Sequence, residues 1–286
     1  MGVDIDLRLP IVYYDQEEER KMKEKSSLEV VQRRSYKVVK ANEIIQKARY
    51  DLSLQELKAL SYCISLIKPN DTIDREYSFS IYEYCEVCGI QYASGKNFSA
   101  IKESLKSLRD KSFWIGLPDG SITTVGWLAK ATINQGSGKV KIKFDPTLQE
   151  YIFGLFENFT QYELLSTLPM QSAYSFRIYE LLKSYAFTRS HTFEIGELKK
   201  HLAAERYSNF KDFRINVIER AVKEINLYTD IEISWEPIYR GRKVISVTFY
   251  IKQRDAWGRI AAEKRANDQI DGQMSLFDLP DPEEGD

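Results

Sequence analysis

Hydrophobic residues recur at helical spacing in two long stretches of this 286-residue chain. In each stretch the intervals between them are three, four and three residues, which predicts an amphipathic helix. Adding 117 to each position of the first set gives the second set. The two sets are Phe98, Ile101, Leu105 and Leu108, and Ile215, Ile218, Val222 and Ile225.

The elements around the two predicted helices also repeat. A helix (51–71 or 175–187), a short alternating strand and a short helix precede each one, and a β-hairpin follows it. The segments FSI at 79 and FEI at 193 mark the two strands. Helix, strand, short helix, long helix and hairpin is the order of a winged helix, a helix-turn-helix with an added hairpin. The predicted fold class is therefore α+β, with two tandem winged-helix domains and flexible N- and C-terminal arms.

Helix-start signals support these boundaries. Ser53 with Glu56, and Ser80 with Glu83, have the spacing of capping boxes, in which each side chain bonds a free backbone donor of the first turn. Gly89 is placed to end the second of these helices. We expect four segments: an N-terminal arm (1–35), a first domain for dimerisation and helper DNA contact (36–156), a principal DNA-recognition domain (157–252) and an acidic tail (253–286).

Charge is distributed unevenly along the chain. The formal net charge is −1, but residues 176–260 carry 16 basic and 11 acidic side chains, and residues 261–286 carry 2 and 8. Residues 176–260 therefore have a net charge of +5, and it is such local charge that attracts phosphates. The net charge of −6 in residues 261–286 masks it in the net charge of the whole chain. No apolar run of about 18 residues predicts a membrane span. The N-terminal stretch lacks the pattern of a secretion signal, and three cysteines without framework spacing favour a reducing, cytoplasmic location.

The second long helix and its hairpin are the best candidates for DNA contact. Asn209, Lys211 and Arg214 lie near the helix start, and Asn and Arg pair bidentately with adenine and guanine edges. Arg240, Arg242 and Lys243 surround Gly241 at the predicted hairpin tip, where cations can meet phosphates. The alternative is an ordinary solvated polar face.

The first half offers a weaker set of basic residues. Lys102, Lys106 and Arg109 form a stripe beside the apolar one, Lys96 and Asn97 lie at the helix start, and Lys139, Lys141 and Lys143 alternate along the last strand. The competing use of this half is self-association, through an apolar hairpin region around Phe113, Trp114 and Trp127.

No set of residues points to covalent chemistry. Cys85 and Cys88 form a CxxC pair without a second pair, which favours packed thiols over a zinc site. His191 and His201 are ten residues apart and cannot form the paired-histidine metal site of a DNA-nicking tyrosine enzyme. We therefore expect neither enzymatic activity nor a cofactor.

Several segments resemble the iteron-binding plasmid replication initiators, in the order that the family has them. They are VVKANEIIQKARYDLSLQELKALSYCISLI, FSIYEYCEVCGI, LKSLRDKSFWI, FDPTLQEYIFGL, FTQYELL and SFRIYELLKSY, and the resemblance covers about residues 36–252. It implies binding to repeated double-stranded origin sequences, origin opening and recruitment of host initiator and helicase. It also implies that monomers bind the repeats and that dimers repress the initiator's own promoter. By position, 209–226 is the principal recognition helix and 97–110 the helper.

The C-terminal tail contains a possible protein-binding peptide. Gln273, Met274, Ser275, Leu276 and Phe277 resemble the pentapeptide with which bacterial replication proteins bind the sliding clamp, with Met274 in place of the usual leucine. An unfolded tail can carry such a peptide to a preformed apolar pocket. The alternatives are that these residues dock on the chain's own domains, or that the acids repel nonspecific DNA.

The sequence thus predicts a plasmid replication initiator that binds and deforms DNA. A winged-helix repressor with the same domains is one alternative, and it has no need of a clamp peptide. A nicking rolling-circle replication enzyme is the other, and it requires metal-dependent cleavage of single-stranded origin DNA.

Overall fold

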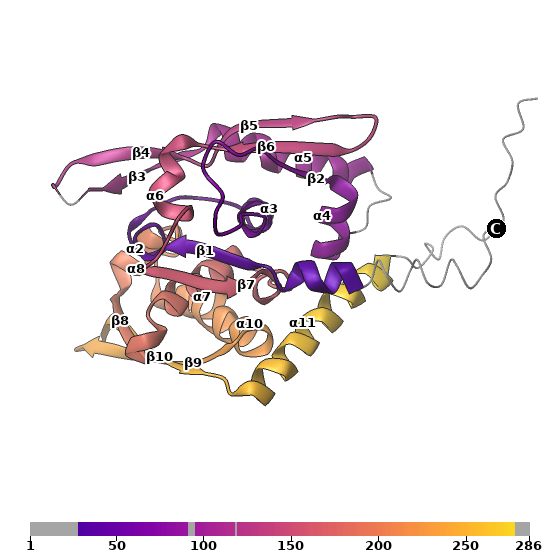
Figure 1. Cartoon of the computed structure of the whole chain (residues 1–286). Helices are drawn as coiled ribbons and strands as arrows, with labels where there is room; N and C mark the ends of the chain where they lie inside the picture. The colour runs from indigo at the N-terminus through magenta and orange to yellow at the C-terminus, as the bar shows by residue number, and fades with distance from the viewer. Residues whose placement is uncertain (1–27, 91–94, 118, 278–286) are drawn as a thin grey trace, which may run out of the picture.

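The computed structural model describes residues 28–90, 95–117 and 119–277, with backbone alone for 95–97 and 273–277. Two units of mixed helix and sheet lie against each other, and the long C-terminal helix runs along the second unit and reaches the first (Figure 1). The described chain begins with a short helix over residues 28–34.

The first unit contains the elements from β1 to α6. Their bounds are β1 Lys37–Ala41, α2 Asn42–Lys47, α3 Leu54–Ser65, β2 Tyr77–Ser80, α4 Ile81–Cys88, α5 Gly95–Asp110, β3 Ser112–Gly116, β4 Ile122–Gly126, β5 Leu128–Ile133, β6 Lys139–Phe144, the 3₁₀ turn η1 Pro146–Leu148 and α6 Gln149–Ile152.

The second unit contains the elements from β7 to β10, and α11 follows it. Their bounds are β7 Phe159–Glu163, η2 Leu164–Ser166, α7 Ala173–Ser184, η3 Ala186–Thr188, β8 Ser190–Glu194, α8 Ile195–His201, α9 Phe210–Phe213, the π-helical segment η4 Arg214–Glu219, α10 Arg220–Tyr228, β9 Ile231–Arg240, β10 Lys243–Gln253 and α11 Ala256–Phe277.

The main sheets of the two units have the same topology. Their strand orders are β2-β6-β5 and β8-β10-β9, so in each sheet the strand that comes first in the chain pairs with the one that comes last. Phe79 lies opposite Val140, and Phe193 lies opposite Val247, in antiparallel register. This confirms the predicted repeat of two winged-helix units.

The predicted helix boundaries are confirmed by their caps. Ser53 and Glu56 form a complete capping box at the start of α3, and Ser80 and Glu83 form another at the start of α4. Gly89 ends α4 with φ of 65°, a left-handed conformation that a residue with a Cβ adopts only with strain.

The predicted dimer surface around Phe113, Trp114 and Trp127 is wrong for two of the three residues. Phe113 and Trp127 are buried and stack on each other, with ring centroids 4.6 Å apart. Residues of β3 alternate between core and solvent, which places Phe113 inward and Trp114 outward, 60% exposed. Large aromatic rings supply much buried area, and the core uses them here.

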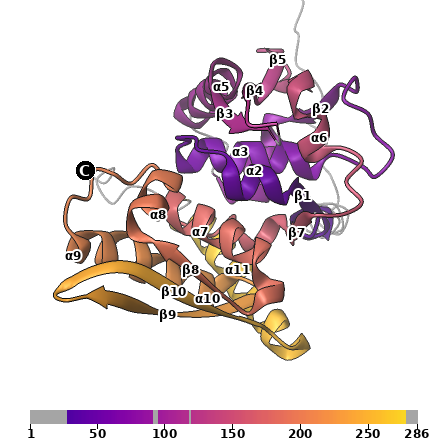
Figure 2. The ribbon, with the colours of Figure 1, turned by 90° about the vertical axis from the view of Figure 1, so that its left-hand side faces the viewer.

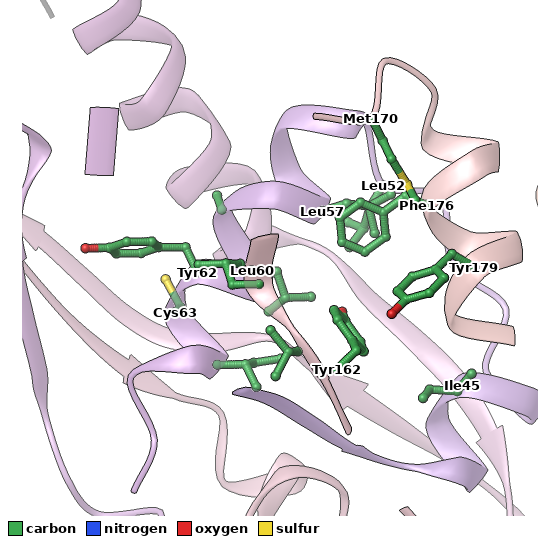
Figure 3. Packing of buried hydrophobic residues seen from close by; sticks show 14 of the residues in the cluster. Ile45, Leu52, Leu57, Leu60, Tyr62, Cys63, Tyr162, Met170, Phe176 and Tyr179 are labelled. Atoms are coloured by element: carbon green, nitrogen blue, oxygen red, sulfur yellow. The ribbon is translucent and has the colours of Figure 1, made fainter. Parts of the chain in front are cut away.

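The two units share one hydrophobic core. β1 pairs with β7, so a two-stranded sheet crosses the boundary predicted at 156/157. Figure 3 shows Leu52 and Leu57 of the first unit beside Met170 and Phe176 of the second. The packing between the units therefore has the character of a protein interior rather than of a flexible linker.

A buried ion pair lies within this shared core. Lys40 Nζ in β1 is 2.6 Å from Glu180 Oε1 in α7, and both side chains are 2% exposed. The Tyr162 hydroxyl donates to the same carboxylate oxygen at 2.5 Å. Charges removed from water this completely need such partners, so the pair fixes how β1 meets α7.

Both predicted flexible arms need correction. Residues 256–277 of the predicted tail form α11, whose Ala262, Ala266 and Ile270 are buried at intervals of four residues. This narrow apolar stripe packs on the body of the protein. It is hard to recognise in the sequence because acidic residues surround it. At the other end, the helix over 28–34 falls inside the predicted N-terminal arm, and its Arg34 is buried.

Lys40→Met should destabilise the protein by about 3–5 kcal/mol, because it leaves Glu180 buried without its partner. Urea unfolding followed by circular dichroism measures this free energy. Lys37→Met is the matched control: Lys37 lies on the same strand, but its ion pair with Glu163 is partly exposed, and its loss should change stability by under about 1 kcal/mol. Equal losses for the two variants would contradict the importance of the buried pair.

Candidate nucleic-acid interface

The predicted recognition helix is one helical stretch of three segments, α9, η4 and α10. The π-helical winding of η4 changes which residues face inward. The buried hydrophobic side chains are Phe213, Val217, Ile218, Ala221 and Ile225. The predicted apolar stripe is therefore wrong at Ile215, which is 44% exposed, and Val222 is only half-buried. A stripe predicted at α-helical spacing is wrong where the helix has π-helical winding, because the inward-facing positions shift.

The three predicted contact residues of this helix differ in their exposure and in their bonding partners. Lys211 is exposed. Arg214 is half-buried, and its Nε is 3.4 Å from Glu219 Oε1, a pair five residues apart that the π winding brings together. Asn209 caps the helix: its Oδ1 accepts from the Asp212 backbone N–H at 2.8 Å. Its capping role accounts for an asparagine at this position without any DNA contact.

The hairpin tip presents the three predicted cations. Arg240, Arg242 and Lys243 are exposed, and none forms an ion pair with another described residue. Gly241 between them has φ of 61°, which the tight turn requires. The Phe210 ring of α9 contacts Trp235 of β9, with centroids 6.4 Å apart. Figure 2 shows the hairpin tip and α9 on the same side of the molecule.

Helix α5 presents the basic residues predicted for the first unit. Lys102, Lys106 and Arg109 are exposed and form no ion pair with another described residue. Lys96 and Asn97 lie in the first turn of α5, where their side chains fall outside the described part of the structure. The helix thus carries a basic face, diluted by the exposed Glu103.

The lysines of β6 alternate as predicted, but two of them have acidic partners. Lys141 Nζ is 2.9 Å from Glu76 Oε1, and Lys143 Nζ is 3.5 Å from Asp74 Oδ1. Lys139 is exposed without a described ion-pair partner. This strand therefore offers less free positive charge than its sequence suggests.

Arg206 is a candidate contact that the sequence analysis missed. It is exposed in the loop before α9, and its guanidinium lies 5.0 Å from the Tyr207 ring centroid and 5.6 Å from that of Tyr174. Stacking on two rings holds the cation in place beside the recognition helix. Its position three residues before Asn209, next to a tyrosine, is the signal that could have indicated it.

The two long helices lie on the same side of the molecule. Figure 2 shows α5 of the first unit above α9 of the second along that side. The exposed cations of both helices and of the β9–β10 tip therefore belong to elements on one side of the molecule. A row of cations on two winged-helix units is suited to the phosphate backbone of a DNA duplex.

Comparisons with known proteins match both winged-helix units. The family model described as initiator replication protein, WH1, matches residues 37–183, and the model described as initiator Rep protein, WH2, matches residues 194–251. The first match alone spans more than half of the chain. The chain belongs to the initiator replication protein family.

A solved structure supports the fold of this initiator. A crystal structure of the Pi initiator protein in complex with iteron DNA superimposes with a TM-score of 0.62, at 18% sequence identity. That match covers 78% of this initiator and 99% of the Pi chain, and at this identity it shows the fold. The WH1 domain of MSBI1.176, a replication protein isolated from a multiple sclerosis patient, is 20% identical, with a TM-score of 0.26, over 35% of the initiator and 77% of that chain.

The cysteines and one histidine of the initiator are packed away from solvent. Burial raises the pKa of Cys85 to about 11 and that of Cys88 to about 12, so both stay protonated near neutral pH. Burial and nearby Arg177 lower the pKa of His201 to about 3. The described residues contain no group of three or more side chains suited to hold a metal ion. None of the described helices is long and apolar enough to cross a bilayer.

Arg242→Ala should weaken DNA binding by a similar factor on every sequence, because a hairpin-tip cation contacts phosphate rather than base edges. The slope of log affinity against log salt should fall by about 0.9 for the lost contact. Fluorescence anisotropy at several salt concentrations measures both. Lys252→Ala, at the opposite end of β10, is the control and should change neither the affinity nor the salt slope. A loss confined to one DNA sequence would contradict the backbone role.

Proposed function

We propose that this initiator binds repeated sequences at a plasmid replication origin with both winged-helix units and opens the DNA there for replication. The observation that carries the proposal is the placement of α5, α9 and the β9–β10 tip on one side of the molecule, with their cations available. Membership of the initiator family supports the replication role. Such a protein acts on DNA in the bacterial cytoplasm.

Each element has a distinct role in the proposed complex. The stretch from α9 to α10 enters the major groove, where Lys211 and Arg214 reach base edges. The β9–β10 tip and Arg206 contact phosphates, which position the protein without reading sequence. Helix α5 places Lys102 and Lys106 on a neighbouring segment of the same duplex.

Opening the DNA then needs binding energy rather than bond-making. Several initiators on adjacent repeats can deform the duplex, and sequences that deform easily lower the energy required. Host initiator and helicase are the proposed partners at this step. A promoter-binding repressor would use the same DNA interface, so autoregulation is compatible with this proposal.

Selection from random duplexes at about physiological salt should enrich one motif, because base-edge contacts give specific sites an advantage of roughly a thousandfold or more over other DNA. Arg214→Ala should weaken binding to that motif by about 1–3 kcal/mol and relax the preference at one base position. Sequencing of the enriched pools measures both. Salt-sensitive binding with no enrichment would contradict the proposal, and so would an unchanged motif preference in Arg214→Ala.

We propose, further, that residues 273–277 bind the bacterial sliding clamp. The support is the pentapeptide pattern and its position at the end of α11, beyond Ile270, the last residue of the stripe that packs on the body. Leu276 and Phe277 would fill an apolar pocket of the partner, and Gln273 would add hydrogen bonds. Met274 replaces a leucine with a side chain of similar volume, a change that apolar sites tolerate well.

Phe277→Ala should weaken clamp binding by about tenfold or more, since truncating an aromatic anchor removes about 2 kcal/mol or more. Surface plasmon resonance with immobilised clamp measures the change. Leu279→Ala, two residues beyond the pentapeptide, is the matched control and should bind as the wild type does. Unchanged binding of Phe277→Ala would refute this role of the peptide.

The initiator is also proposed to form homodimers through the first unit. Trp114 and Ile122 are 60% and 63% exposed on the β3–β4 hairpin, a two-stranded sheet of its own. Apolar residues on an open sheet are suited to pairing with a second copy. Trp114→Ser should lower the dimer fraction in analytical ultracentrifugation at least several-fold. An unchanged fraction would exclude this surface.

A further inference from the structure

Two helices outside both family matches meet each other in the fold. The family models cover 37–183 and 194–251, so neither includes the helix over 28–34 or α11. These helices come from opposite ends of the described chain. They pack together against the end of α4, where the view of Figure 1 shows α11 reaching the first unit.

Arg34 holds this junction together. Its side chain is 2% exposed. Nε donates to the Val87 carbonyl at 3.0 Å and Nη2 donates to the Glu86 carbonyl at 3.2 Å, both at the C-terminus of α4. Nη1 donates to Asn267 Oδ1 at 2.8 Å and to Asp271 Oδ1 at 3.0 Å, both on α11. One rigid, planar guanidinium therefore joins three segments in a fixed geometry.

The end of α4 is also shaped to receive α11. A Cβ placed on Gly89 would lie 2.4 Å from Ile270 Cγ2 and 2.8 Å from the Ile270 carbonyl oxygen. Both distances are shorter than real Cβ contacts, so only glycine allows α11 to approach this closely. Ile270 itself is fully buried.

The other side of α11 bonds the second unit. Arg265 Nε donates to the Leu227 carbonyl at 2.9 Å, and the Tyr228 hydroxyl donates to Gln269 Oε1 at 3.2 Å. Both partners lie at the end of α10, the last segment of the recognition stretch. Helix α11 thus touches the recognition stretch on one side and the first unit on the other.

We infer that α11 and Arg34 form a strut that fixes the angle between the two winged-helix units and thereby sets the spacing of the DNA contacts made by α5 and α9. This inference rests on the proposed function. Arg34 is a positioning residue: its burial excludes it from direct DNA contact. The contacts of α11 with Leu227 and Tyr228 lie at the C-terminal end of α10, away from α9 at the start of the recognition stretch.

The strut is tested first on DNA. Binding is measured to the selected site and to the same site with two base pairs inserted between its two contacted blocks. The wild type should lose about tenfold or more in affinity on the insertion, because one unit can no longer reach its block. Arg34→Ala should bind the original site more weakly and lose under about threefold on the insertion, because its units adjust to the new spacing.

Two further variants keep the test decisive. Asn267→Ala with Asp271→Ala frees α11 while Arg34 keeps its bonds to the α4 carbonyls, so it should behave like Arg34→Ala even where the latter folds poorly. Arg33→Ala is the matched control, because Arg33 bonds Glu83 of the first unit only. Arg33→Ala should lose about as much affinity on the two-base-pair insertion as the wild type does. If the α11 double variant lost as much affinity on the insertion as the wild type does, the inference would be overturned.

A measurement without DNA tests the strut independently of the proposed function. Spin labels on Thr132→Cys in β5 and Ser234→Cys in β9 report the distance between the units, since both positions are exposed and the three native cysteines are buried. The distance distribution should be narrow in the wild type and broad in Arg34→Ala. A distribution equally narrow in both would overturn the strut. Broadening without any sequence-specific DNA binding would keep the strut and reject the DNA role.

Discussion

The buried ion pair between Lys40 and Glu180 joins the two units at one point, and the proposed strut of Arg34 and α11 sets their angle about that point. Two charges at 2% exposure are tolerable only when each satisfies the other, so β1 and α7 have one geometry in which they can meet. The β1–β7 pairing and the shared apolar core join the two units at the same place. With the proposed strut also in place, two winged-helix units that could be independent modules behave as one body.

A single body has consequences for how DNA is read. Each winged helix alone offers one helix and one hairpin, and therefore a short site with modest specificity. Units held at one angle read two short blocks at a fixed distance, and the distance itself becomes part of the recognised sequence. In the proposed complex, the exposed cations of α5, α9 and the β9–β10 tip would supply salt-dependent affinity, and Lys211 and Arg214 would supply discrimination between sequences.

Local signals in the sequence predicted the units well, because their causes are local. The Ser53–Glu56 and Ser80–Glu83 boxes and the left-handed Gly89 depend on residues within one turn, and the structure has all three. The exposed cations of the β9–β10 tip also follow from a short turn sequence.

The errors come from causes that act over longer distances. The exposure of Ile215 results from the π winding of η4, and the burial of Trp127 depends on its packing with Phe113 and Tyr50. Helix α11 was missed because its stripe is two alanines and one isoleucine, too weak to stand out against acidic neighbours. Its partner Arg34 lies 233 residues away from Asn267, a contact that no local pattern reveals.

The most direct measurement of the central claim is a hydroxyl-radical footprint of the purified initiator on its selected DNA site. Two protected blocks should appear, centred about one helical turn (roughly 10 base pairs) apart, on one face of the duplex. One block should disappear when Lys102 and Lys106 of α5 are replaced by alanine. A single protected block in the wild type, unaffected by those replacements, would contradict the claim that both winged-helix units read the same DNA.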